Sequence, residues 1–322
     1  MKLDPVGVIG LGLMGRGIAA SLLGAGFRVI AAGRRQQTIE EARVYIEDAI
    51  AEIVSYDGKF SQKTASWAQR YSVSNSLADL KPCAFVIESV VEDLAVKRRV
   101  FDDLEDIVGA DVPIATNTSA LPITILQQGR KHPSRFLGMH WAEPAYITRF
   151  LEIIRGEQTS DAAIGLAVEL GRATDKESCI VKKDIPGFIA NRLGYAMYRE
   201  AANLLELGVG DVETIDRSFR NACGLWATLC GPFRWIDITG GPALYAKAMA
   251  GVLPTLSSRP EVPHVFREKE ENGERGTINR RGFYTYEEGD AEHWQELLHE
   301  HAWEIRRLQE RYHPLKDDGE AK

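Results

Sequence analysis

Cysteine is scarce in this sequence, and its few copies form no metal-binding or disulfide pattern. Cys83, Cys179, Cys223 and Cys230 are scattered along 322 residues, without CxxC or zinc-finger spacing. Thiols used in this way are typical of the reducing interior of a cell, where disulfides are rare. We therefore expect no structural metal site, no disulfide framework and a cytoplasmic location.

Long apolar runs and a surplus of positive charge are also missing. The first apolar run ends in glycines after Ile9, so this run is too short for a signal-peptide core or a membrane span. No later apolar run reaches the length of a membrane span. The formal net charge is −7, and no long cationic run opposes it. We therefore expect a soluble protein with neither a membrane nor a nucleic acid as partner.

The stretch from Val6 to Arg35 contains the strongest local pattern. A short apolar run at 6–9 breaks into the glycine-rich sequence GLGLMG at 10–15, and a helical pattern of small residues continues to about Ala25. A second apolar run follows at 27–32. This order of strand, glycine turn, helix and strand is the context that makes a GxGxxG match meaningful.

Each position of the glycine turn has its own role in a dinucleotide site. Gly10 permits the tight turn, Gly12 lets backbone N–H groups approach a pyrophosphate, and Gly15 lets the helix pack closely on the strand. Leu13 and Met14 open the helix, whose N-terminus supplies partial positive charge. These residues predict a dinucleotide-binding site, the alternative being a turn that merely tolerates glycine.

The remaining pattern divides the chain into two regions. Up to Asp184, apolar strand candidates alternate with helical patterns, which is typical of a doubly wound parallel sheet of the Rossmann type. After Asp184, helical spacing dominates. We therefore predict an α/β domain at 1–184 and a smaller, all-helical domain at 185–322. The expected strands are 6–9, 27–32, 83–91, 112–116, 136–140, 150–154 and 179–182, with a short helix and strand within 56–76; the expected helices are 14–25, 37–54, 94–108, 122–128, 160–172, 188–207, 211–223, 242–249 and 292–311.

Polar side chains close several predicted strands, where ligands of open α/β sheets bind. Asn117, Thr118 and Ser119 follow one strand, His140 ends another, and Glu152 lies inside an apolar strand. A strand-end histidine can remove a hydroxyl proton while a hydride leaves the same carbon, and a buried carboxylate would orient its ring. Taken singly, each residue also has a purely structural interpretation.

The order and spacing of these phrases resemble the 3-hydroxyacyl-CoA dehydrogenase family from Val6 to about Tyr286. The matching phrases are GLGLMG at 10–15, VVEDLAVK with Glu92 and Lys97, NTS at 117–119, GMH at 138–140, LE at 151–152, and DIPGFIANR at 184–192. The resemblance implies hydride transfer between a nicotinamide cofactor and a β-hydroxy substrate in fatty acid metabolism. It also implies that the helical domain binds substrate and forms the contact of a homodimer.

The resemblance also implies roles for individual residues. His140 would be the general base and Glu152 its partner, Ser119 would bind the reacting oxygen, and Asn191 would complete the polar cage. Besides the glycine turn, the expected cofactor contacts are Gly33, Arg34, Glu92, Lys97, Asn117, Ser119 and Glu143.

The end of the second strand departs from the family pattern. The family usually has an Asp there, which binds the adenosine ribose, whereas this chain has Gly33 followed by Arg34 and Arg35. Gly33 leaves room for a 2′-phosphate, and the arginines can neutralise it. The sequence therefore favours NADP(H). The alternative is that both arginines are solvated and NAD(H) binds.

Two further departures concern the substrate. Glu143 replaces the Asn of the usual HFFNP phrase; it either acts near His140, for example on a cationic or hydroxyl-rich substrate, or points to solvent. The helix at 37–54 carries five acids and only Arg43 as a base, although CoA-using relatives have basic residues there. A 3-hydroxyacyl-CoA type substrate is the leading interpretation. The alternatives are a CoA-free hydroxy acid or alcohol, such as carnitine, gulonate or a pyridine alcohol, and a catalytically idle, crystallin-like dinucleotide binder.

Overall fold

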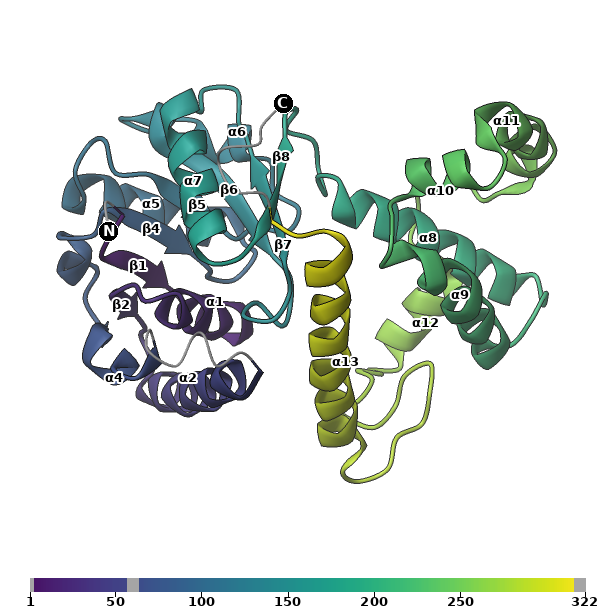
Figure 1. Ribbon diagram of the computed structural model, residues 1–322, viewed down its shortest axis with the longest axis horizontal. Helices are drawn as coiled ribbons and strands as arrows, with labels where there is room; N and C mark the ends of the chain where they lie inside the picture. The colour runs from purple at the N-terminus through teal and green to yellow at the C-terminus, as the bar shows by residue number, and fades with distance from the viewer. Residues whose placement is uncertain (1–2, 57–63, 316–322) are drawn as a thin grey trace. The chain divides into compact units, whose positions relative to one another are not determined.

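The computed structural model describes residues 3–56 and 64–315. The chain forms two compact units, residues 1–191 and 192–322 (Figure 1). The sequence predicts the boundary after Asp184, but the DIPGFIAN segment up to Asn191 belongs to the first unit. Hydrogen bonds from this segment to Glu152 and Ser119 hold it there.

The first unit is built on one eight-stranded sheet with the order β3-β2-β1-β4-β5-β6-β7-β8. All neighbouring strands are parallel except β6 and β7, which are antiparallel. The fold is therefore the predicted Rossmann-type sheet with one departure from the predicted parallel order, because β7 and β8 run opposite to the other six strands. The strands are β1 (Val6–Ile9), β2 (Val29–Ala32), β3 (Tyr71–Ser74), β4 (Phe85–Glu88), β5 (Ile114–Thr116), β6 (Phe136–Trp141), β7 (Phe150–Ile154) and β8 (Glu177–Val181).

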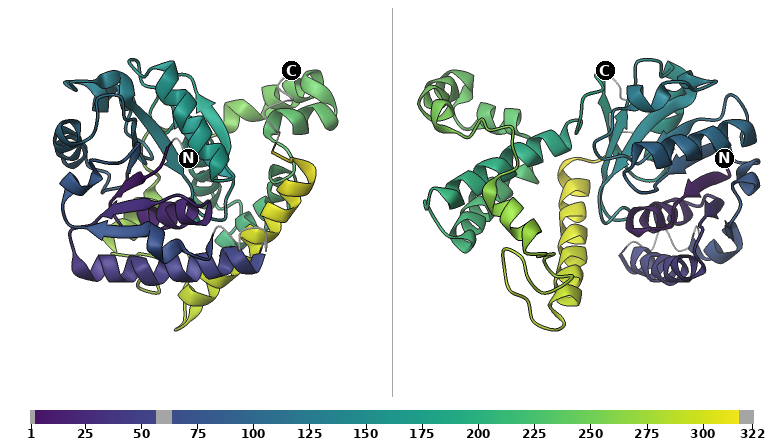
Figure 2. Two further views of the ribbon diagram at one scale, coloured as in Figure 1. Left: turned by 60° about the vertical axis from the view of Figure 1, so that its left-hand side comes forward. Right: turned by 180° about the vertical axis from the view of Figure 1, so that it is seen from behind.

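Helices flank this sheet (Figures 1 and 2). Each long helix of this unit buries apolar residues, which contribute to the core. The central strands β1 and β4 are buried along their whole length, as their largely apolar sequences predict, and the burial includes Glu88 at the end of β4. The helices of this unit lie close to the predicted ranges. They are α1 (Leu13–Gly24), α2 (Gln36–Tyr56), α4 (Trp67–Arg70), α5 (Leu94–Ile107), α6 (Ile123–Gln127) and α7 (Asp161–Ala173).

The register places the carboxyl ends of the central strands at one edge of the sheet. Glu88 of β4 lies opposite Ile9 of β1 on one side and Thr116 of β5 on the other. The turns that follow these strands therefore meet, and this edge carries the predicted site residues. The predicted helix and strand within 56–76 correspond to α4 and β3, and residues 57–63 of that range lie outside the described part of the chain.

The second unit is helical, as predicted, and its described helices bury little of their apolar surface. The sequence does not predict helices α10 and α12. Helix α10 is short, and α12 is mostly charged, with the sequence HVFREKEE. The helices are α8 (Ala190–Glu206), which begins in the first unit, α9 (Val212–Ala227), α10 (Pro232–Ile238), α11 (Gly241–Val252), α12 (His264–Glu271) and α13 (Asp290–Tyr312). Within the described residues, no helix has the length and apolar character needed to cross a membrane.

Candidate active site

The glycine turn between β1 and α1 has the geometry of a phosphate cradle. Gly10 has a φ of +88°, and a Cβ atom there would lie 2.5 Å from the carbonyl oxygen of Ser89. A Cβ at Gly15 would lie 1.8 Å from the carbonyl oxygen of Gly10. A Cβ at Gly12 would meet no atom within 4 Å, so the turn is open on the side where a ligand would approach. Only glycine fits at positions 10 and 15, and Gly12 leaves space for a ligand.

The N-terminus of α1 completes this cradle. Gly12 is the N-cap residue, no side chain accepts a hydrogen bond from the first turn, and that turn contains no acid. Leu13 is half-exposed and Met14 partly so. The first N–H groups of α1 and the positive end of its dipole therefore remain for an anion. The residues fit the pyrophosphate of a dinucleotide.

The end of β2 carries two unpaired guanidinium groups. Gly33 follows β2, and its N–H donates to the carbonyl oxygen of Ser74. Arg34 and Arg35 are exposed. In the part of the chain that the structure describes, neither guanidinium group makes a hydrogen bond or an ion pair with the protein; the only such bond of the two residues is the one that the Arg35 carbonyl accepts from the N–H of Ile39. Both positive charges are therefore available to a ligand at this strand end.

A buried ion pair lies where β4 and β5 end. Lys97 of α5 and Glu88 are both fully buried, and Nζ of Lys97 lies 2.9 Å from Oε1 and 3.0 Å from Oε2 of Glu88. Glu88 also accepts hydrogen bonds from the Thr116 hydroxyl, at 2.6 Å, and from the Val90 N–H. The carboxylate is thus fully bonded. Lys97, which the family resemblance assigns to the cofactor, is occupied within the protein.

Glu92 fixes the loop that carries Ser119. Its Oε1 accepts hydrogen bonds from the Thr118 hydroxyl and from the backbone N–H groups of Ser119, at 2.9 Å, and Ala120, at 3.1 Å. Its Oε2 lies 3.5 Å from Nζ of Lys97. Glu92 therefore connects the buried ion pair to the backbone of Ser119.

Asn117 connects the ends of three strands. Its Nδ2 donates to the Ser89 hydroxyl after β4, and its Oδ1 accepts from the N–H of Trp141 at the end of β6. Its own N–H donates to the carbonyl oxygen of Glu88. These bonds occupy both ends of its amide, so Asn117 holds this edge of the sheet together.

His140 and Glu152 form the predicted pair. They lie directly opposite each other in the antiparallel β6–β7 ladder, and Nδ1 of His140 is 2.9 Å from Oε2 of Glu152. Both residues are buried. The rings of Phe150 and Phe188 pack against the imidazole, with centroid distances of 5.5 and 5.9 Å. Since Glu152 engages Nδ1, the nitrogen left for a substrate is Nε2.

The second oxygen of Glu152 is bonded to the start of α8. Oε1 accepts hydrogen bonds from the N–H groups of Ile189, at 3.0 Å, and Ala190, at 2.9 Å. Burial alone would raise the pKa of Glu152, but the hydrogen bond with His140 and those two N–H groups outweigh it and hold the pKa below its ordinary value. Glu152 therefore stays ionised and can stabilise a proton on His140.

Ser119 and Asn191 also lie together. Nδ2 of Asn191 donates to the carbonyl oxygen of Ser119 at 2.8 Å. Ser119 is exposed and Asn191 is half-buried. This bond and those to Glu152 link the DIPGFIAN segment to both the serine loop and the histidine pair.

Glu143 is held by the protein rather than free in solvent. It is half-buried, and its Oε1 accepts a hydrogen bond of 3.2 Å from the hydroxyl of Tyr45 on α2. Burial and the nearby Glu143 raise the pKa of that tyrosine. A parallel pair joins the Tyr146 hydroxyl to Glu52, also on α2. The loop after His140 is therefore bonded to an acidic helix.

Sequence reasoning missed two contributors to this site. Glu88 is the only charged residue of the strand FVIE, and an acid within a buried apolar run is a usable signal, as it is for Glu152. Tyr45 gave no signal, because a half-buried tyrosine on a helix has no distinctive pattern. Among residues 3–56 and 64–315, no group of His, Cys, Asp and Glu side chains is arranged to hold a metal ion.

Family models match nearly the whole chain. The NAD-binding domain of 3-hydroxyacyl-CoA dehydrogenase matches residues 5–185, and the C-terminal domain of the same family matches residues 187–286. The two matches meet beside the predicted domain boundary. They also place the glycine turn and the His140–Glu152 pair in the NAD-binding domain.

The names of individual relatives describe two kinds of substrate. The chain is 32% identical to 5-formyl-3-hydroxy-2-methylpyridine 4-carboxylate 5-dehydrogenase of Mesorhizobium japonicum over 87% of this chain and 90% of the relative. It is 34% identical to 3-hydroxybutyryl-CoA dehydrogenase of Bradyrhizobium diazoefficiens over 67% of this chain and 73% of the relative.

Solved structures repeat this division. A crystal structure of 5-formyl-3-hydroxy-2-methylpyridine 4-carboxylic acid 5-dehydrogenase, described as an NAD⁺ dependent dismutase, has a TM-score of 0.88 at 29% identity and covers 95% of this chain and 98% of its own. The (S)-3-hydroxybutyryl-CoA dehydrogenase of Ralstonia eutropha has a TM-score of 0.73 at 30% identity, over 88% and 99% of the two chains. With its glycine cradle, its histidine–carboxylate pair and these matches, the chain belongs to the 3-hydroxyacyl-CoA dehydrogenase family.

Proposed function

We propose that this protein is a nicotinamide-dependent dehydrogenase of a small hydroxy compound that is not carried on CoA. The observation that carries this proposal is the His140–Glu152 pair beside an acidic helix, α2, which is bonded to the loop after His140. The pair supplies the base that oxidation of a hydroxyl requires. The acidic residues of α2 disfavour a substrate that carries the phosphate charges of CoA.

His140 removes the hydroxyl proton in this proposal. Glu152 accepts a hydrogen bond from Nδ1–H, so Nε2 of the neutral ring is free to take the proton. The carboxylate then stabilises the imidazolium. Ser119 and Asn191 hold the reacting oxygen, and the bound nicotinamide ring supplies the hydride acceptor, or the donor in the reverse direction.

The charge of α2 argues against a CoA thioester. Its residues 37–54 include five acids and the single base Arg43, and Glu52 and Glu143 are joined to Tyr146 and Tyr45. CoA carries several phosphate charges, and acids at its binding surface repel them. The relative from Mesorhizobium japonicum, whose name describes a pyridine carboxylate, supports a small ring-bearing or carboxylate-bearing substrate.

A 3-hydroxyacyl-CoA substrate is the second candidate. It is favoured by the family models and by the relatives named 3-hydroxybutyryl-CoA dehydrogenase. A substrate panel separates the two candidates by following the absorbance of reduced nicotinamide. Turnover with hydroxy acids or pyridine alcohols and aldehydes, but not with acetoacetyl-CoA, supports the proposal. Efficient reduction of acetoacetyl-CoA would replace it with the second candidate, and cofactor binding without turnover of either class would favour an idle dinucleotide binder.

For the cofactor, we propose a preference for NADP(H). It is supported by the guanidinium groups of Arg34 and Arg35, which have no partner among the described residues, and by the absence of a carboxylate at Gly33. An Asp at this position would repel a 2′-phosphate and bond the ribose of NAD instead. NAD(H) is the alternative, and it is the cofactor named for the solved pyridine-carboxylate dehydrogenase.

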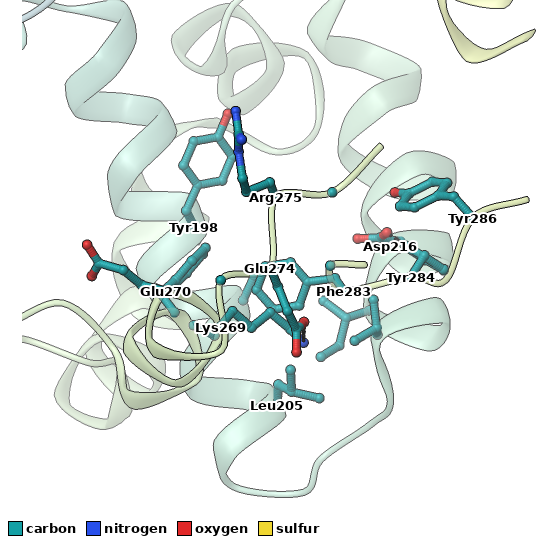
Figure 3. A pocket seen from close by; sticks show the side chains of 18 residues that line it. Tyr198, Leu205, Asp216, Lys269, Glu270, Glu274, Arg275, Phe283, Tyr284 and Tyr286 are labelled. Atoms are coloured by element: carbon teal, nitrogen blue, oxygen red, sulfur yellow. Dashed lines mark hydrogen bonds and ion pairs between the residues drawn. The ribbon is translucent and has the colours of Figure 1, made fainter. Parts of the chain in front are cut away.

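For the assembly, we propose a homodimer built by the helical unit. This unit contains an open, largely apolar cavity of about 770 Å³, and Figure 3 shows Tyr198, Leu205, Phe283 and Tyr284 among the side chains around it. Large apolar side chains elsewhere in the unit are also exposed, including Leu225 at 72% and Phe233 at 84%. Monomeric proteins rarely expose so much apolar surface. A second copy of the same unit would cover it.

A further inference from the structure

Phe188 has an unusual backbone conformation for a bulky residue. Its φ is +51°, in the left-handed region that glycine adopts easily and aromatic residues avoid. The preceding residue, Gly187, also has a positive φ, of +75°. Phe188 nevertheless exposes only 1% of its surface. Strain of this kind persists where the surroundings hold it, and it clusters at functional sites.

The turn at Phe188 directs two backbone N–H groups to the catalytic carboxylate. Ile189 and Ala190 follow it immediately, and their N–H groups donate to Oε1 of Glu152 at 3.0 and 2.9 Å. Since Oε1 is taken in this way, Oε2 is the oxygen that bonds His140 at 2.9 Å. The local backbone conformation therefore decides how the carboxylate presents itself to the histidine.

The ring of Phe188 holds this turn in place. It is buried in a cluster with Ile123, Ile154 and Val181. The same ring packs against His140, with centroids 5.9 Å apart and planes inclined by 57°. One side chain thus anchors the strained turn and bounds the imidazole that Glu152 orients.

We propose that Phe188 is a positioning residue for the reaction, acting through Glu152. Its buried ring locks the left-handed turn, and the turn delivers the N–H groups that fix the carboxylate against His140. The proposal rests on the function proposed above, in which His140 and Glu152 form the catalytic pair.

Substitutions at Phe188 distinguish the effect of the backbone conformation at this position from the effect of the aromatic ring. Phe188→Gly removes the ring but keeps a residue that adopts a positive φ without strain. Phe188→Ala removes the ring and leaves a residue that disfavours this conformation. Phe150→Leu is the matched control. The ring of Phe150 also packs against His140, with centroids 5.5 Å apart, but Phe150 is not part of the turn whose N–H groups bond the Glu152 carboxylate. Phe188→Leu, which keeps the apolar volume, replaces Phe188→Ala if circular dichroism shows that the latter does not fold.

We expect the loss in kcat to depend on how well the residue at position 188 tolerates a positive φ, and not on the size of its side chain. For Phe188→Ala we expect kcat to fall by about ten- to a hundredfold, since small displacements of a catalytic group have effects of this order. Phe188→Gly should retain more activity than Phe188→Ala although it is smaller, and Phe150→Leu should remain within about threefold of the wild type, as expected for a contact that leaves the pair in place. KM and cofactor affinity should be nearly unchanged.

A double-mutant cycle with Glu152→Gln tests whether Phe188 acts through Glu152. In single-turnover measurements, Phe188→Ala should add little to the loss already caused by Glu152→Gln. Additive losses, a kcat order that follows size, or a loss confined to KM would overturn the proposal for Phe188 while leaving the catalytic pair intact. Wild-type kcat for Glu152→Gln would overturn both the proposal and the function on which it rests.

Discussion

Lys97 and Glu88 form an ion pair with no solvent exposure at either side chain, with Nζ 2.9 Å from Oε1. The same ammonium group lies 3.5 Å from Oε2 of Glu92, whose other oxygen binds the Ser119 loop. One buried cation therefore connects the end of β4 with the loop that presents the predicted oxygen-binding serine. Its role is structural support of the site, and this can be measured.

Lys97→Met should strongly destabilise the protein, because it leaves Glu88 buried without its counter-charge. Removing one partner of a buried pair typically costs about 3–5 kcal/mol. Urea denaturation gives the free energy of unfolding. Lys131→Met is the control, because Lys131 and Asp106 form an exposed pair, and such pairs contribute about 0–1 kcal/mol. Equal effects of the two substitutions would contradict this account.

Glu92 should make the stability of the protein depend on acidity. Burial alone would raise its pKa, but the hydrogen bond from Thr118, the charge of Lys97 and the N–H groups of Ala120 and Ser119 together hold the pKa below its ordinary value. The unfolded chain therefore binds a proton on Glu92 more readily than the folded chain does. The stabilisation by Glu92 is present above the unfolded pKa, about 4.3, and is lost as the pH falls through the lower folded pKa.

Denaturation of the wild type and Glu92→Gln across this acid range measures the effect. The wild type should be the more stable protein near neutrality, and the difference should shrink as the pH falls below about 4. Glu288→Gln is the control, because Glu288 is exposed and its carboxylate forms an ion pair only with Arg280 among the described residues. A difference between wild type and Glu92→Gln that stays constant with pH would refute the assignment.

His140→Ala should lower kcat about 10²–10⁴-fold, the usual effect of losing a general base. Cofactor affinity should change little, because the glycine turn and α1 are untouched. Steady-state rates and a fluorescence titration with reduced cofactor measure the two quantities. His132→Ala, at an exposed histidine, serves as control. Turnover of His140→Ala within about twofold of the wild type would end the proposed mechanism.

The cofactor preference should reverse when the end of β2 is changed. Gly33→Asp combined with Arg34→Ile adds the ribose-binding carboxylate and removes a phosphate-binding group. A charge-assisted hydrogen bond is worth about 1.5–3 kcal/mol, so the wild type should bind NADPH about ten- to a hundredfold more tightly than NADH. Fluorescence titration at moderate salt measures both affinities.

A matched control for the cofactor experiment lies at the other end of the same strand. Arg28→Ile removes an exposed guanidinium group that pairs with Asp4 before β2 begins, and it should leave the preference unchanged. Tighter binding of NADH than of NADPH by the wild type would refute the preference. Arg34 would then be an ordinary solvated arginine.

The helical unit should hold two copies together in solution. Phe233→Asp places a charge on one of its most exposed apolar positions and should shift the sedimentation profile toward monomer. Val44→Asp is the control, because Val44 is also an exposed apolar residue but lies on α2 in the first unit. A stable wild-type monomer at micromolar concentration would contradict the proposed dimer.

The sequence predicts the first unit well because most of its strands lie in largely apolar runs and the glycine turn has a fixed chemistry. The glycines at 10, 12 and 15 specify a backbone shape, so their role is readable without a fold. The sequence does not predict that β7 and β8 run opposite to the other strands, since an apolar run such as FLEII looks alike in both directions.

Contacts between distant segments are what the sequence predicts least. The bond between Tyr45 and Glu143 joins residues 98 positions apart, and neither residue type specifies such a partner. The strained φ of Phe188 is equally hidden, because an aromatic residue predicts the opposite conformation. For Glu143, one of the two predicted alternatives, a side chain pointing to solvent, is wrong, because Tyr45 bonds it.

The antiparallel ladder between β6 and β7 makes the spacing of His140 and Glu152 independent of the loop that joins the two strands. His140 and Glu152 are cross-strand neighbours, so the hydrogen bonds of the ladder fix their spacing whatever the length of the loop between them. That loop includes Glu143 and Tyr146, which contact α2. Replacement of a loop residue that contacts α2, such as Glu143, can therefore change the surroundings of the proposed substrate while the ladder keeps His140 and Glu152 paired. A scaffold arranged in this way can acquire new substrates while it keeps one reaction.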